Sequence, residues 1–223
     1  MPGTVIFTGP TLHPSEAASL LHATVLPPVK RGDLAAVAAL APEVIAIVDG
    51  EFYQNLAVSP REILPFLERG VRVYGASSMG ALRAVELSRF GMIGVGRVFR
   101  LFRLGILDAD DEVALTYCPW SYEAVSEPLV NTRYALRAAV RRGVLTRPEA
   151  AALVARLKAA YFPDRTRALL LSLATDLLGP ARASALREFL ALSPCDVKHA
   201  DARLLIDTLL RERISDNRAT FLL

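Results

Sequence analysis

The chain has 223 residues, a formal net charge of +3 and 52% hydrophobic residues, enough for one large domain or a core domain with a smaller second part. The longest apolar run, residues 34–48, contains Pro42 and Glu43 and is too short to span a bilayer. No basic run is interleaved with aromatic residues, so we expect neither nucleic acid nor a membrane as a partner. Two widely separated cysteines and the lack of a basic targeting region favour a reducing, cytoplasmic setting, with no metal or cofactor.

Short apolar runs alternate with helix patterns in the N-terminal half. Strands are predicted at residues 5–7, 23–26, 44–48 and 71–74, and helices at 15–21, 34–40, 59–68 and 79–87. Ser59 and Glu62 have the spacing of a capping box at the start of the third helix. This alternation predicts an α/β fold with a parallel, doubly wound, Rossmann-like sheet that has helices on both faces.

The carboxyl ends of parallel strands form the usual ligand crevice of such a sheet. Here they are predicted at Thr8–Pro10, Pro27–Lys30, Asp49–Gly50 and Gly75–Gly80. Asp49 has two interpretations, a ligand contact or an ordinary turn former. Lys30 is one of only three lysines among 26 basic residues, which favours a site where an amine must be able to lose its proton, because arginine cannot.

The segment Ala76-Ser77-Ser78-Met79-Gly80 has the form small-x-Ser-x-Gly between a strand and a helix. This is the pattern of a nucleophile elbow, which exposes a serine hydroxyl at a sharp turn. The first amides of the following helix have no intrahelical acceptor and can stabilise an oxyanion. The alternative is that Ser78 or Ser77 only caps the helix.

The chain changes character after about Tyr122. Amphipathic helices are predicted at about residues 127–142, 147–161, 164–177, 180–190 and 200–213, and residues 214–223 resemble a tail. We therefore divide the chain into an α/β core, residues 1–118, and a helical extension, residues 119–223, that packs on it, with one continuous domain as the alternative. The glycines at 91, 94 and 96 do not form a dinucleotide-binding motif, and the acidic cluster at 108–112 is interpreted as a solvated helix start.

Several segments together resemble the TfuA-like proteins. They are VIFTGP, PPVKRGD, VIAIVDGEF, REIL, GVRVYGASSMGALRAVEL, FGMIGVGRVF and DDEVA, in that order over about residues 4–116. The resemblance implies a partner of YcaO enzymes, which use ATP to activate a peptide-backbone amide for replacement of its oxygen by sulfur. It also implies hydrolysis of a thiocarboxylated ubiquitin-like sulfur carrier of the ThiS type, and help to the YcaO enzyme in engaging its precursor peptide.

The family is associated with a hydrolase-like Ser-Lys pair, which the resemblance places at Ser78 and Lys30. Ser78 is preferred to Ser77 on the elbow spacing. A partly buried Lys30 would have its ammonium form disfavoured and could take the Ser78 proton.

Further residues are assigned to substrate binding: the amides of Met79 and Gly80, with Gly9, hold the oxyanion. Asp49 or Glu86 orients the lysine, and Ser77 is also assigned to substrate binding. Arg83 either binds the carrier's terminal carboxylate or thiocarboxylate or is a plain surface residue. The rival hypothesis is a non-catalytic adaptor that binds the carrier and the YcaO enzyme. A third, a phosphate-binding α/β protein, lacks a P-loop lysine.

Overall fold

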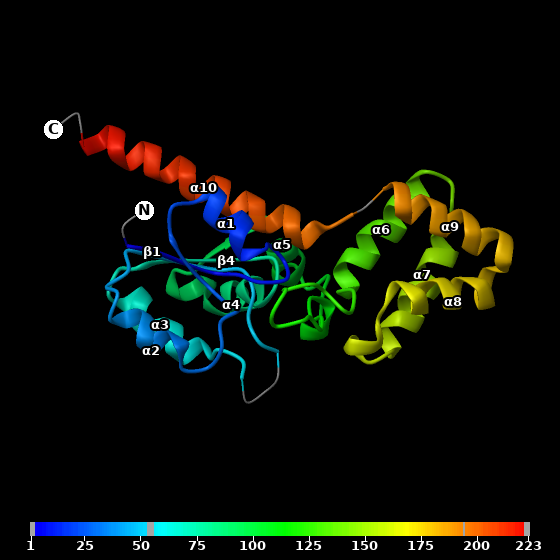
Figure 1. Cartoon of the computed structure of the whole chain (residues 1–223), viewed down its shortest axis with the longest axis horizontal. Helices are drawn as coiled ribbons and strands as arrows, with labels where there is room; N and C mark the ends of the chain where they lie inside the picture. The colour runs from blue at the N-terminus through cyan, green and yellow to red at the C-terminus, as the bar shows by residue number, and fades with distance from the viewer. Residues whose placement is uncertain (1–2, 53–55, 194, 221–223) are drawn as a thin grey trace. The chain divides into compact units, whose positions relative to one another are not determined.

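The computed structural model describes residues 3–52, 56–193 and 195–220, with side chains up to residue 214. The chain forms two compact units, Met1–Asp108 with Lys198–Leu223, and Ala109–Val197. The last helix therefore belongs to the same unit as the N-terminal half (Figure 1). The division expected from the sequence, after residue 118, had grouped that helix with the other helices of the second half.

The first unit is built on a parallel sheet of five strands. They are β1 (Thr4–Phe7), β2 (Thr24–Leu26), β3 (Val44–Ile47), β4 (Arg72–Ala76) and β5 (Ile93–Val95), in the order β2-β1-β3-β4-β5. Ile6 in β1 lies opposite Val25 on one side and Ala46 on the other. This is the order of flavodoxin-like sheets, which have their topological switch point between β1 and β3. The carboxyl ends of these two strands are therefore where a ligand crevice is expected.

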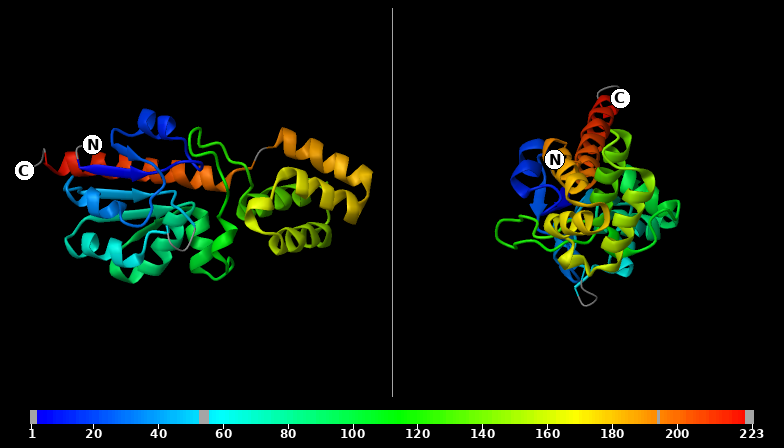
Figure 2. Two further views of the ribbon diagram at one scale, coloured as in Figure 1. Left: turned by 60° about the horizontal axis from the view of Figure 1, so that its bottom comes forward. Right: turned by 90° about the vertical axis from the view of Figure 1, so that its right-hand side faces the viewer.

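Helices cover both faces of this sheet, as the sequence predicted (Figure 2). One face packs against α1 (Pro14–Leu20) and α10 (Val197–Thr220), because alternate strand residues such as Ala46 and Tyr74 form a core with Leu205 and Ile206 of α10. The other face carries α2 (Asp33–Ala38), α3 (Pro60–Glu68) and α4 (Met79–Leu87). The capping box predicted at Ser59 is present at the start of α3. The predicted α/β class is confirmed.

Two parts of the first unit differ from the sequence prediction. Strand β5 and helix α5 (Gly96–Arg103) were not predicted, because a three-residue strand that contains Gly94 gives almost no periodic pattern. The predicted tail is wrong within the described residues, since α10 continues to Thr220.

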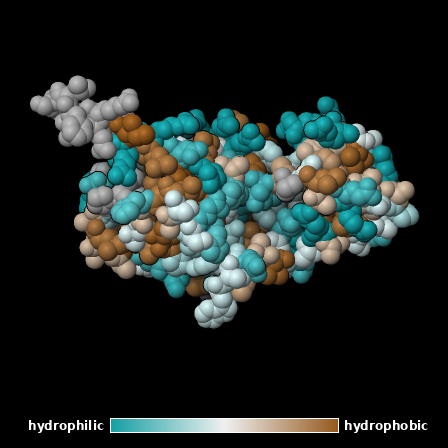
Figure 3. Space-filling view, turned by 45° about the horizontal axis from the view of Figure 1, so that its top comes forward, coloured by the Kyte–Doolittle hydropathy of each residue, from teal (hydrophilic) through white to brown (hydrophobic). Residues whose placement is uncertain are grey.

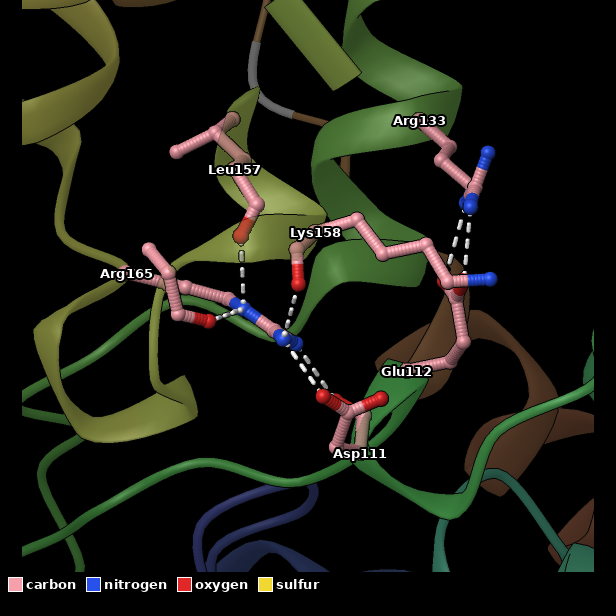
Figure 4. Close-up of polar contacts among 7 residues, drawn as sticks. Asp111, Glu112, Arg133, Leu157, Lys158 and Arg165 are labelled. Atoms are coloured by element: carbon pink, nitrogen blue, oxygen red, sulfur yellow. Dashed lines mark hydrogen bonds and ion pairs between the residues drawn. The ribbon is translucent and has the colours of Figure 1, made fainter. Parts of the chain in front are cut away.

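The second unit consists of four helices with their own apolar core. They are α6 (Leu129–Arg141), α7 (Arg147–Ala159), α8 (Arg167–Leu178) and α9 (Pro180–Leu192). Glu112, which is fully buried, accepts two hydrogen bonds from the Arg133 guanidinium, at 2.8 and 2.6 Å. The buried Arg165 donates to the carbonyls of Leu157 and Lys158 at the end of α7 and to the Asp111 carboxylate (Figure 4). Residues Asp110–Glu112 do begin a short 3-10 helix, and Asp108 and Asp110 are exposed, as the interpretation as a solvated helix start expected. Asp111 and Glu112 differ from it, because they belong to a paired, partly buried network.

Figure 3 shows hydrophobic patches lying between hydrophilic areas on one face of the molecule. Large apolar side chains exposed on α10 include Leu204 and Ile214. Within the described residues, no helix is both long enough and apolar enough to cross a membrane.

Candidate functional site

Asp49 holds together the two loops at the switch point of the sheet. It follows β3, is 2% exposed, and its Oδ2 accepts hydrogen bonds from the amides of Gly9 and Thr11, both at 2.9 Å. The Thr11 hydroxyl donates to Oδ1 of the same carboxylate. Asp49 is therefore more than an ordinary turn former, because it fixes the loop that follows β1.

The turn after β4 has the close backbone packing expected of an elbow. Ser77 adopts a left-handed conformation with φ 65°, and the Ser78 amide donates to the Ala76 carbonyl at 2.7 Å. A Cβ atom placed on Gly75 would lie 2.0 Å from the Gly80 carbonyl oxygen, so only glycine fits there. The first turn of α4 can thus approach the ends of β3 and β4 directly.

The two serines of this turn have different surroundings. The Ser77 hydroxyl is completely buried and donates to the Lys198 carbonyl at 2.7 Å. Ser78 is 2% exposed and occupies the N-cap position of α4, but its side chain makes no capping hydrogen bond, and among the described residues its hydroxyl has no hydrogen-bond partner. Ser78 is therefore the N-cap residue, as the alternative held, but neither serine caps α4 with its side chain.

Lys198 is a residue of this site that the sequence analysis did not identify. It lies in the first turn of α10, is 2% exposed and is among the largest fully buried side chains of the described residues. Its carbonyl binds Ser77, and its charge acts on the Asp49 carboxylate. The scarcity of lysine, which was used to select Lys30, applies equally to Lys198 and is the signal that would have found it.

The protonation of Asp49 is set by opposing effects. Burial raises the pKa of the Asp49 carboxyl, although the positive charge of Lys198 and the hydrogen bonds from Thr11 and Gly9 act in the opposite direction. A buried amine close to a buried carboxylate is a pair whose proton distribution responds strongly to any ligand that enters between them.

Lys30 lies at the same edge of the sheet but is exposed. Its neighbour Val29 pairs with Gly50, and its own amide donates to the Asp33 carboxylate at 2.9 Å. The expectation that Lys30 is partly buried is therefore wrong. The pairing of Lys30 with Ser78 stays a prediction.

The amides assigned to an oxyanion hole are not equally available. The Gly9 amide donates to Asp49, and the Gly80 amide donates to the Val48 carbonyl at 3.3 Å. Met79 is the first residue of α4, and among the described residues its amide has no acceptor. The Met79 amide is thus the donor that remains for a ligand.

Arg83 is occupied by contacts within the first unit. Its side chain is 12% exposed, its Nε donates to the Val58 carbonyl at 2.7 Å, and its guanidinium forms an ion pair with Glu86 at 2.7 Å. The interpretation as a plain surface residue is therefore wrong. Binding of a carrier carboxylate by Arg83 stays a prediction, and it would require Arg83 to leave Glu86.

Among the described residues, no group of three or more His, Cys, Asp or Glu side chains is placed to hold a metal ion. The arrangement that remains is a serine turn, a buried lysine and a buried aspartate at the carboxyl edge of a parallel sheet. Such groups can perform nucleophilic chemistry on an acyl compound.

Comparison with known proteins identifies the family. A family model for TfuA-like proteins matches residues 49–166, more than half of the chain. No curated protein matches the chain. The matched segment includes Asp49, both serines of the turn, Arg83, and helices α6 and α7. The chain belongs to the TfuA-like family.

Proposed function

We propose that this protein hydrolyses the C-terminal thiocarboxylate of a ubiquitin-like sulfur carrier of the ThiS type, and that the released sulfide serves a YcaO enzyme in peptide-backbone thioamidation. Membership of the TfuA-like family supports an accessory role in thioamidation. One observation supports the hydrolytic step: the turn of Ser77 and Ser78, the buried Lys198 and Asp49 lie together at the carboxyl edge of the sheet.

The reaction proceeds in two steps. The Ser78 hydroxyl attacks the thiocarboxylate carbonyl and gives its proton to a lysine amine, the Met79 amide stabilises the oxyanion, and sulfide leaves as the acyl-serine forms. Water then attacks the acyl-serine, which restores the hydroxyl and leaves an ordinary carboxylate on the carrier. No oxidant or reductant is required, because sulfur leaves as sulfide.

Burial supports Lys198 over Lys30 as the amine in this step. A buried amine has its ammonium form disfavoured by loss of hydration, and Lys198 is buried whereas Lys30 is exposed. The Asp49 carboxylate opposes this effect. Entry of the anionic thiocarboxylate would place a second negative charge beside Asp49, which favours the protonated Asp49 carboxyl and so removes the charge by which Asp49 stabilises the Lys198 ammonium.

The test is sulfide release from a thiocarboxylated carrier protein in the absence of any YcaO enzyme. We expect turnover by the wild type and a fall of about 10³-fold or more in Ser78→Ala. Lys198→Arg should be equally inactive, because arginine keeps the charge but cannot accept a proton. Lys30→Arg is the matched control and should keep its activity; loss of activity in Lys30→Arg with full activity in Lys198→Arg would return the role to Lys30.

One observation favours the non-catalytic adaptor as a second candidate. The amides of Gly9 and Gly80 are already bonded within the protein, so that of the three amides assigned to the oxyanion only that of Met79 is without an acceptor among the described residues. An adaptor would bind the carrier tightly, release no sulfide and form no covalent adduct. Mass spectrometry of an acyl adduct at Ser78 separates the two functions.

A further inference from the structure

A groove of about 910 Å³ runs along the α6–α7 helix pair of the second unit. Its apolar floor comes from Leu136 and Val140 of α6 and from Ala151, Val154 and Ala155 of α7. Val140 and Val154 remain half-buried. Because α7 places alanines along this face, the larger side chains of α6 meet no partner of matching size there, and the groove stays open.

Five cationic side chains line the same groove, and no acidic residue in the part of the chain that the structure describes does so. They are Arg133, Arg137, Arg141, Arg147 and Lys158. The first three are spaced four residues apart on α6, so they form one row along the helix. Like charges four residues apart repel one another and destabilise the helix. We therefore expect negative charges outside α6 to balance them.

The charges at one end of this row are balanced within the unit. The buried Glu112 carboxylate binds Arg133 and lies 3.9 Å from the Lys158 ammonium (Figure 4). Among the described residues, no carboxylate lies within 4.0 Å of the side chains of Arg137, Arg141 or Arg147. The uncompensated positive charge is thus concentrated along the middle and the far end of the groove.

We propose that this groove docks an acidic amphipathic helix of a protein partner. An apolar floor with rims of one charge matches a helix that has an apolar stripe and acidic flanks. Apolar side chains of the partner would fill the space above the alanines of α7, while its carboxylates pair with the row on α6. This docking does not depend on the hydrolytic step at Ser78.

Binding is tested with the full chain and a labelled synthetic peptide of about 16 residues, long enough for roughly four helical turns. Its leucines are spaced i, i+3, i+4 and i+7 and its polar positions are glutamate. Two comparison peptides have lysine at the polar positions, or the same composition in an order without helical periodicity. Fluorescence anisotropy at physiological salt gives the dissociation constants.

We expect the periodic acidic peptide to bind at least about tenfold more tightly than either comparison peptide. Arg137→Glu and Ala151→Leu should each weaken binding by about tenfold or more, the first by reversing a rim charge and the second by filling the floor without a change in charge. Arg187→Glu, on the exposed side of α9, makes the same charge change outside the groove and should leave binding unchanged.

Two results would overturn the proposal. One is binding weaker than about 1 mM for the periodic acidic peptide. The other is attraction by net charge alone, which would appear as an equal loss of affinity in Arg187→Glu and Arg137→Glu or as equal binding of the non-periodic peptide. Circular dichroism of each variant should match that of the wild type, which shows that the total helix content is kept.

Discussion

Replacing Gly80 by alanine should strongly destabilise the first unit, although local helix propensity predicts the opposite. Gly80 is the second residue of α4. In a helix, alanine is favoured over glycine by about 1 kcal/mol. Helix propensity alone would therefore make the variant more stable than the wild type.

The packing of α4 on the sheet reverses this expectation. A Cβ atom on Gly80 would lie 1.7 Å from the carbonyl oxygen of Ile47 and 2.6 Å from its carbonyl carbon. Both belong to the backbone of β3, which pairs with β1 and β4 and cannot move aside as a flexible side chain would. The first turn of α4 must therefore shift away from the sheet, which also breaks the bond from the Gly80 amide to Val48.

Overpacking of this kind costs about 1–3 kcal/mol, and more where the backbone must move. Because the main chain of β3 opposes the shift, we take the upper value of about 3 kcal/mol, and the lost bond from the Gly80 amide to Val48 adds about 1 kcal/mol. The gain in helix propensity offsets about 1 kcal/mol, so we expect a net loss of about 3 kcal/mol in the free energy of unfolding. Urea unfolding followed by far-UV circular dichroism measures this loss. Sulfide release by any folded Gly80→Ala protein should also fall, because the shift moves the Met79 amide.

Gly70→Ala is the matched control. Gly70 has φ +82°, and a Cβ atom there would meet no atom within 4 Å. It should cost only about 1–2 kcal/mol for the left-handed conformation. A Gly80→Ala variant that is as stable as the wild type, or more stable than Gly70→Ala, would refute the close approach of α4 to β3.

Two further variants each test one buried charged side chain, one in the first unit and one in the second. Burial raises the pKa of the Asp201 carboxyl, which accepts a 2.7 Å hydrogen bond from the Val98 amide. The pKa of this carboxyl is about 4 in the unfolded chain, so its deprotonation lowers the stability of the folded wild type as pH rises from about 4 towards the folded pKa. The stability of Asp201→Asn relative to the wild type should therefore increase over this pH range, as measured by urea unfolding at several pH values. A difference that does not change with pH would contradict this reasoning. In the second unit, Arg165→Met leaves the Leu157 carbonyl and the Asp111 carboxylate without the donor that Arg165 supplies. Thermal unfolding should therefore show a loss of about 3 kcal/mol in the free energy of unfolding. A variant as stable as the wild type would disprove the role assigned to Arg165.

The strands and helices of the N-terminal half could be predicted because their patterns are local. The run Val44–Val48 is apolar and branched, as buried parallel strands are. The capping box at Ser59 fixed the start of α3. Strand β5 was not predicted, because its three residues have no pattern of their own. The strand is held by the pairing of these residues with Tyr74, Gly75 and Ala76 of β4.

The candidate site was predicted only in part, for the same physical reason. The elbow pattern identified the turn at Ser77 and Ser78, since small residues at fixed spacing are what a tight strand-to-helix turn needs. The hydrogen bond of Ser77 to the Lys198 carbonyl, in contrast, joins residues 121 positions apart. No local pattern marks such a contact, so the choice of Lys30 rested on composition and on the resemblance alone.

The position of α10 explains why the end of the chain matters for a site formed near its beginning. In a doubly wound sheet, helices must cover both faces, and here α1 leaves part of one face to be covered by Leu205, Ile206 and Leu209 of α10. Packing of these residues on the sheet fixes the first turn of the same helix at the carboxyl edge, where Lys198 meets Ser77 and Asp49. The apolar face of α10 thus positions its one buried lysine, so that the packing of the core and the composition of the site are set by the same helix.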